Sequence, residues 1–207
     1  MKAPAQARST LHRAAAESTQ QRLKLAALQA LDDLGLSNFK IAEVIGRAEV
    51  ARGTYYLYFK DSDEILRAIA LDFIAGLEQT LAALPVEHEL LPLLNGVMGC
   101  YVRYIIQNRT AATLTYQMAG SDAQVMTRFD TMIRQWAGNA ATAIARTGSS
   151  QESKQELTHL SFAMICMLEG YFRYALRGDN VSARTLQRDA NATAASFVKI
   201  WSRAVSG

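Results

Sequence analysis

The sequence predicts an all-α protein of about nine helices, with an N-terminal three-helix domain followed by a larger C-terminal helical bundle. Half of the 207 residues are apolar and only three are proline, so a sizeable helical core can form. Apolar residues recur at spacings of three and four along most of the chain. Strand signals are nearly absent, because the sequence has no sustained apolar–polar alternation and no hairpin pattern.

Residues 1–17 show no apolar pattern and are expected to form a flexible basic arm. Arg8 and Arg13 are placed to follow a DNA backbone or to enter a minor groove, as basic arms do, and an arm without any partner fits the pattern equally. The first helix is expected over residues 18–34, where apolar residues recur on one face. Gly35 then ends it.

Residues 39–59 have the spacing of a short helix, a tight turn and a second short helix that begins near Arg52. Ser37 and Asn38 are expected to cap the first of these helices. Two short helices joined by such a turn form a helix-turn-helix, whose second helix is suited to the major groove of DNA. The outward face of the second helix is basic and rich in hydroxyl groups: Arg52, Thr54, Tyr56 and Lys60.

Several short motifs follow one another in a fixed order between Leu23 and Leu66. They are Ala26-Ala27, Gly35, Ala48, Val50, Gly53-Thr54, Tyr56, Tyr58-Phe59 and Glu64. In this order the chain resembles the TetR-type (tetracycline-repressor-like) transcriptional regulators over about a fifth of its length. Two positions depart from the family's pattern, because Glu49 stands where the turn usually has glycine and Ile45 stands where alanine is usual. Glu49 must adopt the turn conformation without the freedom of glycine.

The resemblance implies that this segment binds double-stranded operator DNA. Arg52 opens the second helix and can donate a bidentate pair to guanine, while Gly53 permits close approach and Lys60 is placed for a phosphate. Tyr55 and Tyr58 fit two roles, as supports in the core or as contacts in the groove. The predicted DNA-binding residues are Lys40, Arg52, Gly53, Thr54, Tyr55, Tyr56, Tyr58 and Lys60.

The charge of the chain is unevenly distributed. Residues 1–60 contain nine Lys or Arg and five Asp or Glu, a net charge of +4, whereas the remainder contains 13 basic and 14 acidic residues, a net charge of −1. The positive field therefore coincides with the predicted DNA-binding element, as expected for a protein that contacts phosphates.

The remaining helices are predicted by their apolar stripes and by the breaks between them. Asp61 and Glu64 have the chemistry of a capping box at the start of the fourth helix, and Pro92 delays or kinks the fifth. The expected ranges are 62–84, 87–107, 109–119, 123–146, 151–176 and 182 onward. We expect the DNA-binding domain over residues 18–62 and a ligand-binding and dimerisation domain over residues 63–207.

The eighth helix is apolar nearly all round between Leu160 and Tyr174, so it has to be covered on all sides. One side can face the core of the protein and another a second subunit, which suits a four-helix bundle across a two-fold axis. The resemblance implies the same, because TetR-type proteins dimerise through their last two helices. Trp201 and the alanine-rich face of the ninth helix are expected at or near this interface; a monomer with a large core is the alternative.

The middle of the chain is rich in Met, Tyr and Phe, which are able to line a cavity for an apolar ligand and also able simply to fill a core. By family analogy a small-molecule inducer binds here. Arg103 and Glu169 lie in apolar stretches, where a buried charge needs a partner. Three roles fit: a structural pair within the protein, a side chain that reaches the surface, or a contact to a charged group of a ligand. The candidate ligand-binding residues are Met98, Tyr101, Arg103, Tyr104, Tyr116, Met126, Phe129, Trp136, Cys166 and Glu169.

The sequence has few residues in the patterns of catalytic or cofactor-binding motifs, and neither an enzymatic activity nor a cofactor is expected. Glu156 and His159 match half of a di-iron motif, but no second copy exists. Cys100 and Cys166 lie in apolar runs and are expected to be buried, inert thiols, with a redox pair or sensor as the alternative. No stretch has the length of a signal peptide or membrane span, so a cytoplasmic protein is expected.

The sequence thus predicts a homodimeric transcriptional regulator that binds a palindromic operator and is released by a small-molecule inducer. A repressor is expected because most of the family are repressors. Two alternatives remain at this point, a helical dimeric interaction protein with degenerate DNA binding and a helical-bundle metalloprotein.

Overall fold

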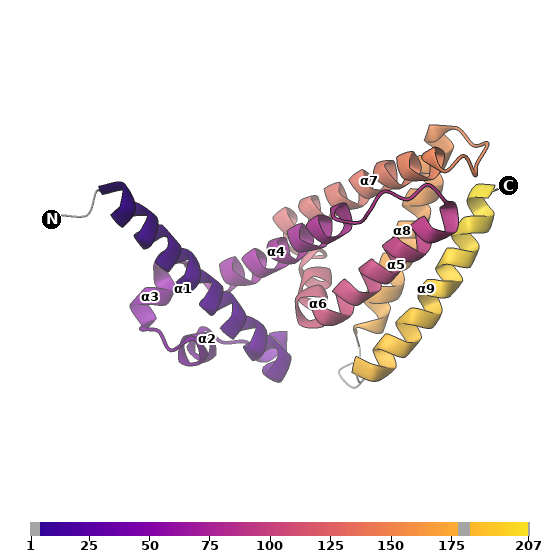
Figure 1. Cartoon of the computed structure of the whole chain (residues 1–207). Coiled ribbons are helices and arrows are strands. Elements are labelled where there is room, and N and C mark those ends of the chain that lie inside the picture. Colours follow the sequence, from indigo (N-terminus) through magenta and orange to yellow (C-terminus); the bar gives the residue numbers. More distant parts are fainter. Residues whose placement is uncertain (1–4, 178–182, 207) are drawn as a thin grey trace. The chain divides into compact units, whose positions relative to one another are not determined.

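A computed structural model describes the backbone of residues 5–177 and 183–206. In these residues the chain forms nine α-helices and one short 3-10 helix, and no strand (Figure 1). The all-α prediction is therefore confirmed. The chain divides into two compact units, residues 1–69 and 70–207.

The first unit contains three α-helices, one 3-10 helix and the start of a fourth α-helix. They are α1 (Ala5–Leu34), η1 (Leu36–Asn38), α2 (Ile41–Ala48), α3 (Arg52–Tyr56) and the first turns of α4 (Ser62–Ala82). Their apolar faces meet in a small core with Leu23, Val44, Tyr55 and Ile65 fully buried. Helices as short as α2 and α3 are marginal in isolation, so this shared core is what holds them in place.

Two local predictions in this unit are wrong. Helix α1 begins at Ala5, so most of the segment expected to be a flexible arm is helical; alanine, frequent at 14–16, is the strongest helix former. Asn38 does not cap α2, because its side-chain amide donates to the carbonyl of Leu34 at 3.1 Å and closes the end of α1. Helix α2 has Lys40 at its N-cap, without a side-chain cap bond.

The predicted capping of α4 is confirmed. The Asp61 carboxylate accepts from the backbone N–H of Glu64 at 2.8 Å, and the Glu64 carboxylate accepts from the backbone N–H of Lys60 at 2.7 Å. Both contacts satisfy donors that a helix start leaves without partners. Helix α4 continues without a break to Ala82, so its residues up to Ile69 belong to the first unit and those from Ala70 to the second.

The second unit is a helical bundle built from the rest of α4 and from five further helices: α5 (Leu90–Gln107), α6 (Arg109–Met118), α7 (Ala123–Arg146), α8 (Lys154–Ala175) and α9 (Ala183–Ser206). Helix α7 packs along α8, α5 packs along α9, and α8 contacts α9 (Figure 1). Asp122 caps α7 through the N–H groups of Gln124 and Val125. Pro92 lies in the first turn of α5, where a missing N–H is tolerated.

Helix α8 begins with a capping box between Ser153 and Glu156. The Ser153 hydroxyl accepts from the N–H of Glu156 at 3.3 Å, and the Glu156 carboxylate accepts from the N–H of Ser153 at 2.9 Å. These two bonds give Glu156 a structural role at the start of α8.

Helices α4 and α5 approach closely at Gly76. The Tyr104 hydroxyl of α5 donates to the backbone carbonyl of Phe73 at 3.0 Å, and a Cβ atom at Gly76 would collide with that hydroxyl. A glycine at this position therefore lets the tyrosine lie against the α4 backbone.

Within the part of the chain that the structure describes, none of the helices combines the length and the apolar character needed to cross a membrane.

Candidate DNA-reading surface and ligand pocket

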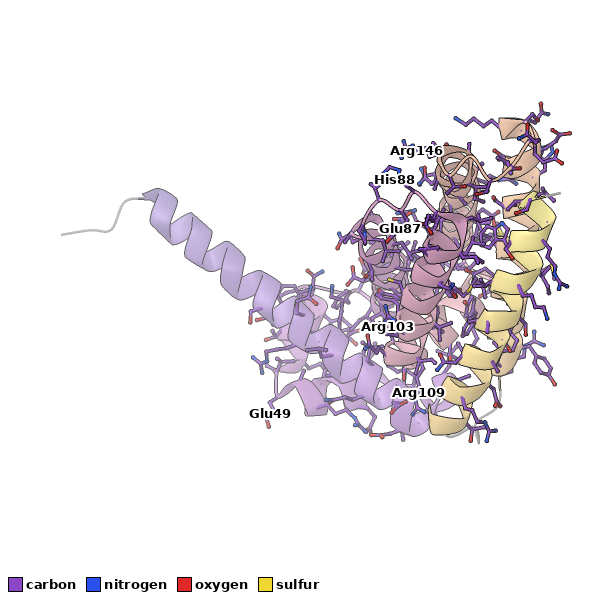
Figure 2. The ribbon with its side chains drawn as sticks, turned by 45° about the vertical axis from the view of Figure 1, so that its right-hand side comes forward. Glu49, Glu87, His88, Arg103, Arg109 and Arg146 are labelled. Atoms are coloured by element: carbon purple, nitrogen blue, oxygen red, sulfur yellow. The ribbon has the colours of Figure 1, made fainter. Side chains whose placement is uncertain are left out.

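The turn between α2 and α3 has the geometry of a helix-turn-helix. Glu49 adopts the left-handed conformation, with φ 52° and ψ 48°, and its N–H is bonded to the carbonyl of Gly46. This is the conformation expected at a position that usually has glycine. The Glu49 side chain projects from the turn (Figure 2) and is exposed, so its negative charge lies on the surface beside α3.

Two arginines attach this turn to α1. The Arg22 guanidinium donates to the carbonyl of Ala48 at 2.6 Å, at the end of α2. Arg47 forms an ion pair with Asp33 at 2.7 Å. Both contacts join residues of α1 to the end of α2, so they hold in place the turn that leads into α3.

The surface of α3 and the residues that follow it is basic and largely exposed. Arg52, Gly53, Tyr56 and Lys60 are exposed, and Thr54 is half-buried. The Arg52 guanidinium lies 5.8 Å from the centroid of the Tyr56 ring, a cation–π geometry that orients the arginine along the helix. Outside this group, Lys40 is exposed at the start of α2 and Tyr58 is half-buried.

Tyr55 belongs to the core, so of its two expected roles it is the support in the core, and its place among the predicted DNA-binding residues is wrong. Its side chain has no exposed surface, and its hydroxyl donates to the carbonyl of Asp61 at 2.9 Å. Burial, with the nearby charge of Asp61, raises the pKa of Tyr55 to about 12, so the hydroxyl remains a donor. Helical geometry explains the difference between neighbours, because Tyr55 and Tyr56 point about 100° apart.

Sequence reasoning overlooked Leu57, directly after α3, whose side chain is 81% exposed. Its apolar character favoured a place in the core, and only the position of the turn shows that it faces outward.

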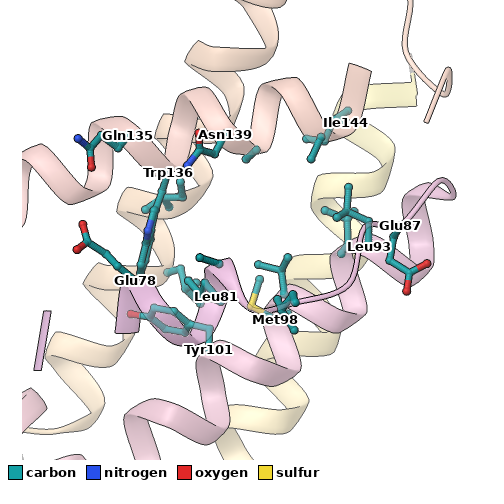
Figure 3. A pocket seen from close by; sticks show the side chains of 18 of the residues that line it. Glu78, Leu81, Glu87, Leu93, Met98, Tyr101, Gln135, Trp136, Asn139 and Ile144 are labelled. Atoms are coloured by element: carbon teal, nitrogen blue, oxygen red, sulfur yellow. The ribbon is translucent and has the colours of Figure 1, made fainter. Parts of the chain in front are cut away.

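A pocket of about 690 Å³ lies within the second unit (Figure 3). Its volume is in the range of roughly 300–1,000 Å³ found for small-molecule sites. Lining residues come from the end of α4, from residues 84–87 and from α5, α7, α8 and α9. The buried part of the lining is apolar or aromatic, with Leu94, Met98, Tyr101, Ile144 and Trp201.

Helix α7 borders the pocket with a polar stripe. Arg128, Thr131, Gln135 and Asn139 recur at spacings of three and four, and all four line the pocket. The Arg128 guanidinium and the Glu78 carboxylate of α4 form a bidentate ion pair, in which Nη1 lies 2.9 Å from Oε1. This pair connects α4 to α7 at the edge of the pocket.

The ten candidate ligand residues are divided by the structure. Met98, Tyr101 and Trp136 line the pocket, whereas the other seven are not among its lining residues. Those seven are Arg103, Tyr104, Tyr116, Met126, Phe129, Cys166 and Glu169. Arg103, Met126 and Cys166 are exposed. Of the roles considered for Arg103, its exposure fits the side chain that reaches the surface (Figure 2). The expectation of a buried thiol holds for Cys100 and not for Cys166.

Glu169 is a buried charge, and its partners are two tyrosines. The Tyr101 hydroxyl donates to Oε1 and the Tyr116 hydroxyl donates to Oε2, each at 2.7 Å. The two hydroxyl oxygens are 3.1 Å apart. Burial raises the pKa of Glu169 to about 6, against the lowering effect of the two hydrogen bonds and of the charge on Arg173.

The same carboxylate affects the tyrosines. Burial, reinforced by the charge of Glu169, raises the pKa of Tyr101 and of Tyr116 well above 10. Both hydroxyls therefore remain protonated donors at neutral pH. We call Tyr101, Tyr116 and Glu169 the carboxylate triangle. Of these three residues only Tyr101 lines the pocket, so the triangle adjoins the pocket without opening into it.

Helices α8 and α9 each have exposed apolar side chains. On α8, Met167 is 52% and Tyr174 77% exposed, and on α9 Ile200 is 49% exposed. Ala163 and Gly170, about one turn before and after Met167, are exposed as well. Trp201, expected at or near a subunit interface, instead lies in the interior and lines the pocket, with 4% of its surface exposed.

The metalloprotein alternative has no site in the described residues, because no group of three or more His, Cys, Asp or Glu comes together there in a way that could hold a metal ion.

The arrangement of the helices matches that of several solved regulators. A transcriptional regulator from Rhodococcus sp. Rha1 aligns with a TM-score of 0.70 and 12% identity, over 91% of this chain and 98% of that one. A TetR-like regulator from the same strain gives 0.63 and 16%, over 87% and 96%. The TetR-family regulator PfmR from Thermus thermophilus gives 0.61 and 18%, over 86% and 97%. No family model and no curated protein matches the sequence.

Proposed function

The chain has the fold of the TetR-family transcriptional regulators, and we propose that it regulates transcription by binding an inverted-repeat operator as a homodimer. The observation that supports this most directly is the exposed basic face of α3, with Arg52, Tyr56 and Lys60 beside a fixed turn. An inverted repeat is expected because the symmetry of a dimer requires the same symmetry of its site.

Gly53, in the first turn of α3, is compatible with DNA contact there. A Cβ atom at this position would meet nothing within 4 Å, so the packing of the protein does not require a glycine. The missing side chain leaves room for the DNA backbone or a base edge to approach α3 closely.

The test begins with selection of operator sequences from random double-stranded DNA, followed by affinity measurements. Gly53→Ala should weaken operator binding without loss of stability. Gly46→Ala is the matched control, because a Cβ at Gly46 in α2 also meets nothing within 4 Å. Equal operator affinity in both variants would contradict the contact at α3, and failure to select any DNA would favour the helical interaction protein.

We propose that the exposed apolar side chains of α8 and α9 form the subunit interface. Exposed apolar patches of this kind mark sites of association, and a two-fold axis would place the same face on each partner. The exposed Ala163 and Gly170 would let two α8 helices approach closely.

We propose that a small molecule bound in the pocket releases the protein from DNA, so that the protein acts as a repressor. Of the predicted ligand-binding residues, Met98, Tyr101 and Trp136 line this pocket. Helix α4 contributes Glu78, Leu81 and Ala82 to the lining and also has residues in the DNA-binding unit. A ligand that favours one orientation of α4 by differential affinity would change operator binding.

A further inference from the structure

The pocket is long compared with its volume. Lining residues occur at every turn of α7 from Thr131 to Ile144, a distance of about 20 Å at a rise of about 1.5 Å per residue. A spherical cavity of about 690 Å³ would be about 11 Å across, roughly two helical turns. The pocket is therefore a slot that follows the axis of α7.

The opposite wall of the slot has the same direction (Figure 3). Glu78 of α4 lies near Trp136 at one end, and Leu93 of α5 lies toward Ile144 at the other, with Met98 between the two ends. A slot of this length and volume has a mean width of about 6–7 Å. That width is enough for one file of carbon atoms and too narrow for two, given contact distances of about 3.5–4.0 Å.

The buried part of the lining contains no charged side chain among the described residues. The charged lining residues lie at the ends, where Glu78 and Arg128 neutralise each other and Glu87 and Arg146 remain solvent-accessible. A charge placed among the buried residues would lose its hydration without gaining a partner. The buried lining residues are apolar or aromatic: Leu94, Met98, Tyr101, Ile144, Ile165, Leu168 and Trp201.

We infer that the ligand of this pocket is a single-chain aliphatic amphiphile, with one unbranched hydrocarbon chain along α7 and a polar head group that remains in solvent at an end of the slot. An extended chain with C–C bonds of about 1.5 Å advances about 1.25 Å per carbon, so about 16 carbons span the distance from Thr131 to Ile144. The inference rests on the proposed ligand-responsive function and specifies the chemical class of the ligand.

The length of the slot can be tested with linear 1-alkanols of about 6 to 14 carbons, kept below their solubility limits. Both tryptophans of the chain, Trp136 and Trp201, line the pocket, so the intrinsic fluorescence of the protein reports its occupation. Each buried CH₂ group should lower the Kd roughly fourfold, and this gain should continue through 14 carbons. A compact pocket about 11 Å across would take only about nine extended carbons, so a gain that ends by about nine carbons would overturn the inference.

The width of the slot can be tested on the wild type with two alcohols of equal carbon number. Dodecan-1-ol is a chain and cyclododecanol is a ring, and each has one hydroxyl group. We expect the ring to bind at least about tenfold more weakly, because it cannot bury all of its CH₂ groups in a narrow slot. A ring that binds as tightly as the chain would overturn the inference.

A substitution in α7 places a block inside the slot. Ala140→Phe leaves about 13 Å from Thr131 to the new ring, which is the length of about ten carbons, so the gain in affinity should end there. Ala145→Phe is the matched control and should behave as the wild type, because Ala145 is exposed and outside the lining. The inference is overturned if Ala140→Phe weakens all chain lengths alike or changes none. Should this variant not fold, the comparison of chain and ring on the wild type still decides.

Operator release is measured separately with the same alcohols. Chains that bind as expected without releasing DNA would count against the proposed switch alone. Release of DNA by cyclododecanol and not by dodecan-1-ol would overturn the inference and leave the switch standing. If no alcohol changes the fluorescence of the wild type, the inference is overturned.

Discussion

The carboxylate triangle is expected to make the folded protein less stable as the pH rises. The pKa of Glu169 is raised from 4.5 to about 6, chiefly by burial, so the folded state binds this proton more tightly than the unfolded chain. The contribution is therefore fully present below about pH 4.5 and is lost as the pH rises through about 6. The difference between the two pKa values corresponds to about 2 kcal/mol.

The geometry of the triangle can also accommodate the protonated carboxyl group, although burial and not the tyrosines raises its pKa. When Glu169 is ionised, both tyrosine hydroxyls donate to it, and the 3.1 Å contact between the hydroxyl oxygens has no proton. When Glu169 is protonated, it can donate to one tyrosine, which donates to the second, which donates back to the carboxyl group. That closed ring satisfies every polar atom of the triangle.

The assay compares the free energy of unfolding of the wild type and of Glu169→Gln in urea, from about pH 4 to about pH 8. Wild type minus variant should fall by about 2 kcal/mol across this range. Glu156→Gln, in the same helix, is the matched control: the hydrogen bond from Ser153 lowers the pKa of the exposed Glu156, so stability from that group is lost as the pH falls.

Tyr116→Phe sharpens the test. It removes one of the two donors that stabilise the ionised carboxylate, so the pKa of Glu169, measured from its carboxyl carbon by NMR, should rise further. Parallel stability curves for wild type and Glu169→Gln, or a wild type that gains stability relative to the variant with rising pH, would refute this account of the triangle.

Further predictions concern DNA, assembly and packing. Arg52→Ala should weaken binding to the selected operator by about 1–3 kcal/mol and make the protein less selective among base sequences, whereas Lys60→Ala should weaken binding to all sequences alike and lower the slope of log affinity against log salt concentration by roughly one. Titrations at several salt concentrations distinguish the two effects. An unchanged base preference in Arg52→Ala would show that Arg52 does not read the sequence. Met167→Glu should convert a dimer at micromolar concentration into a monomer by light scattering, and a wild-type monomer would reject the interface. Gly76→Ala should lower the melting temperature in the wild type but not in Tyr104→Phe, where no hydroxyl blocks the new methyl group; equal losses in both backgrounds would contradict the proposed collision.

Most of the fold could be predicted from the sequence because its determinants are local. Apolar stripes located the helices, and a short capping motif at Asp61 located the start of α4. Arg103 shows the limit of this reasoning, because the sequence pattern left its exposure open. It lies in sequence between apolar residues, but successive helical residues point about 100° apart, so a charge beside buried Tyr101 can face the solvent.

The pocket could be predicted only in part because its lining depends on which helices meet. Arg128, Gln135 and Asn139 have the spacing of a solvated face of α7, and nothing near them in the sequence shows that the end of α4 lies opposite. The position of Trp201 was hard to predict for the same reason, since a tryptophan in an amphipathic helix can face a partner subunit or the interior. The partners of Glu169 are likewise 53 and 68 residues away.

The two faces of α9 have a consequence for the energetics of the assembly. Trp201 lines the pocket, while its neighbour Ile200 is among the exposed apolar side chains proposed to join two subunits. If occupation of the pocket shifts α9, the free energies of ligand binding and of dimerisation are coupled, and the coupling has to be reciprocal. If ligand binding changes the dimerisation constant by some factor, dimerisation changes the ligand affinity by the same factor. The apparent affinity for the ligand would then vary with protein concentration, and two ligand sites could influence one another across the interface without sharing a contact.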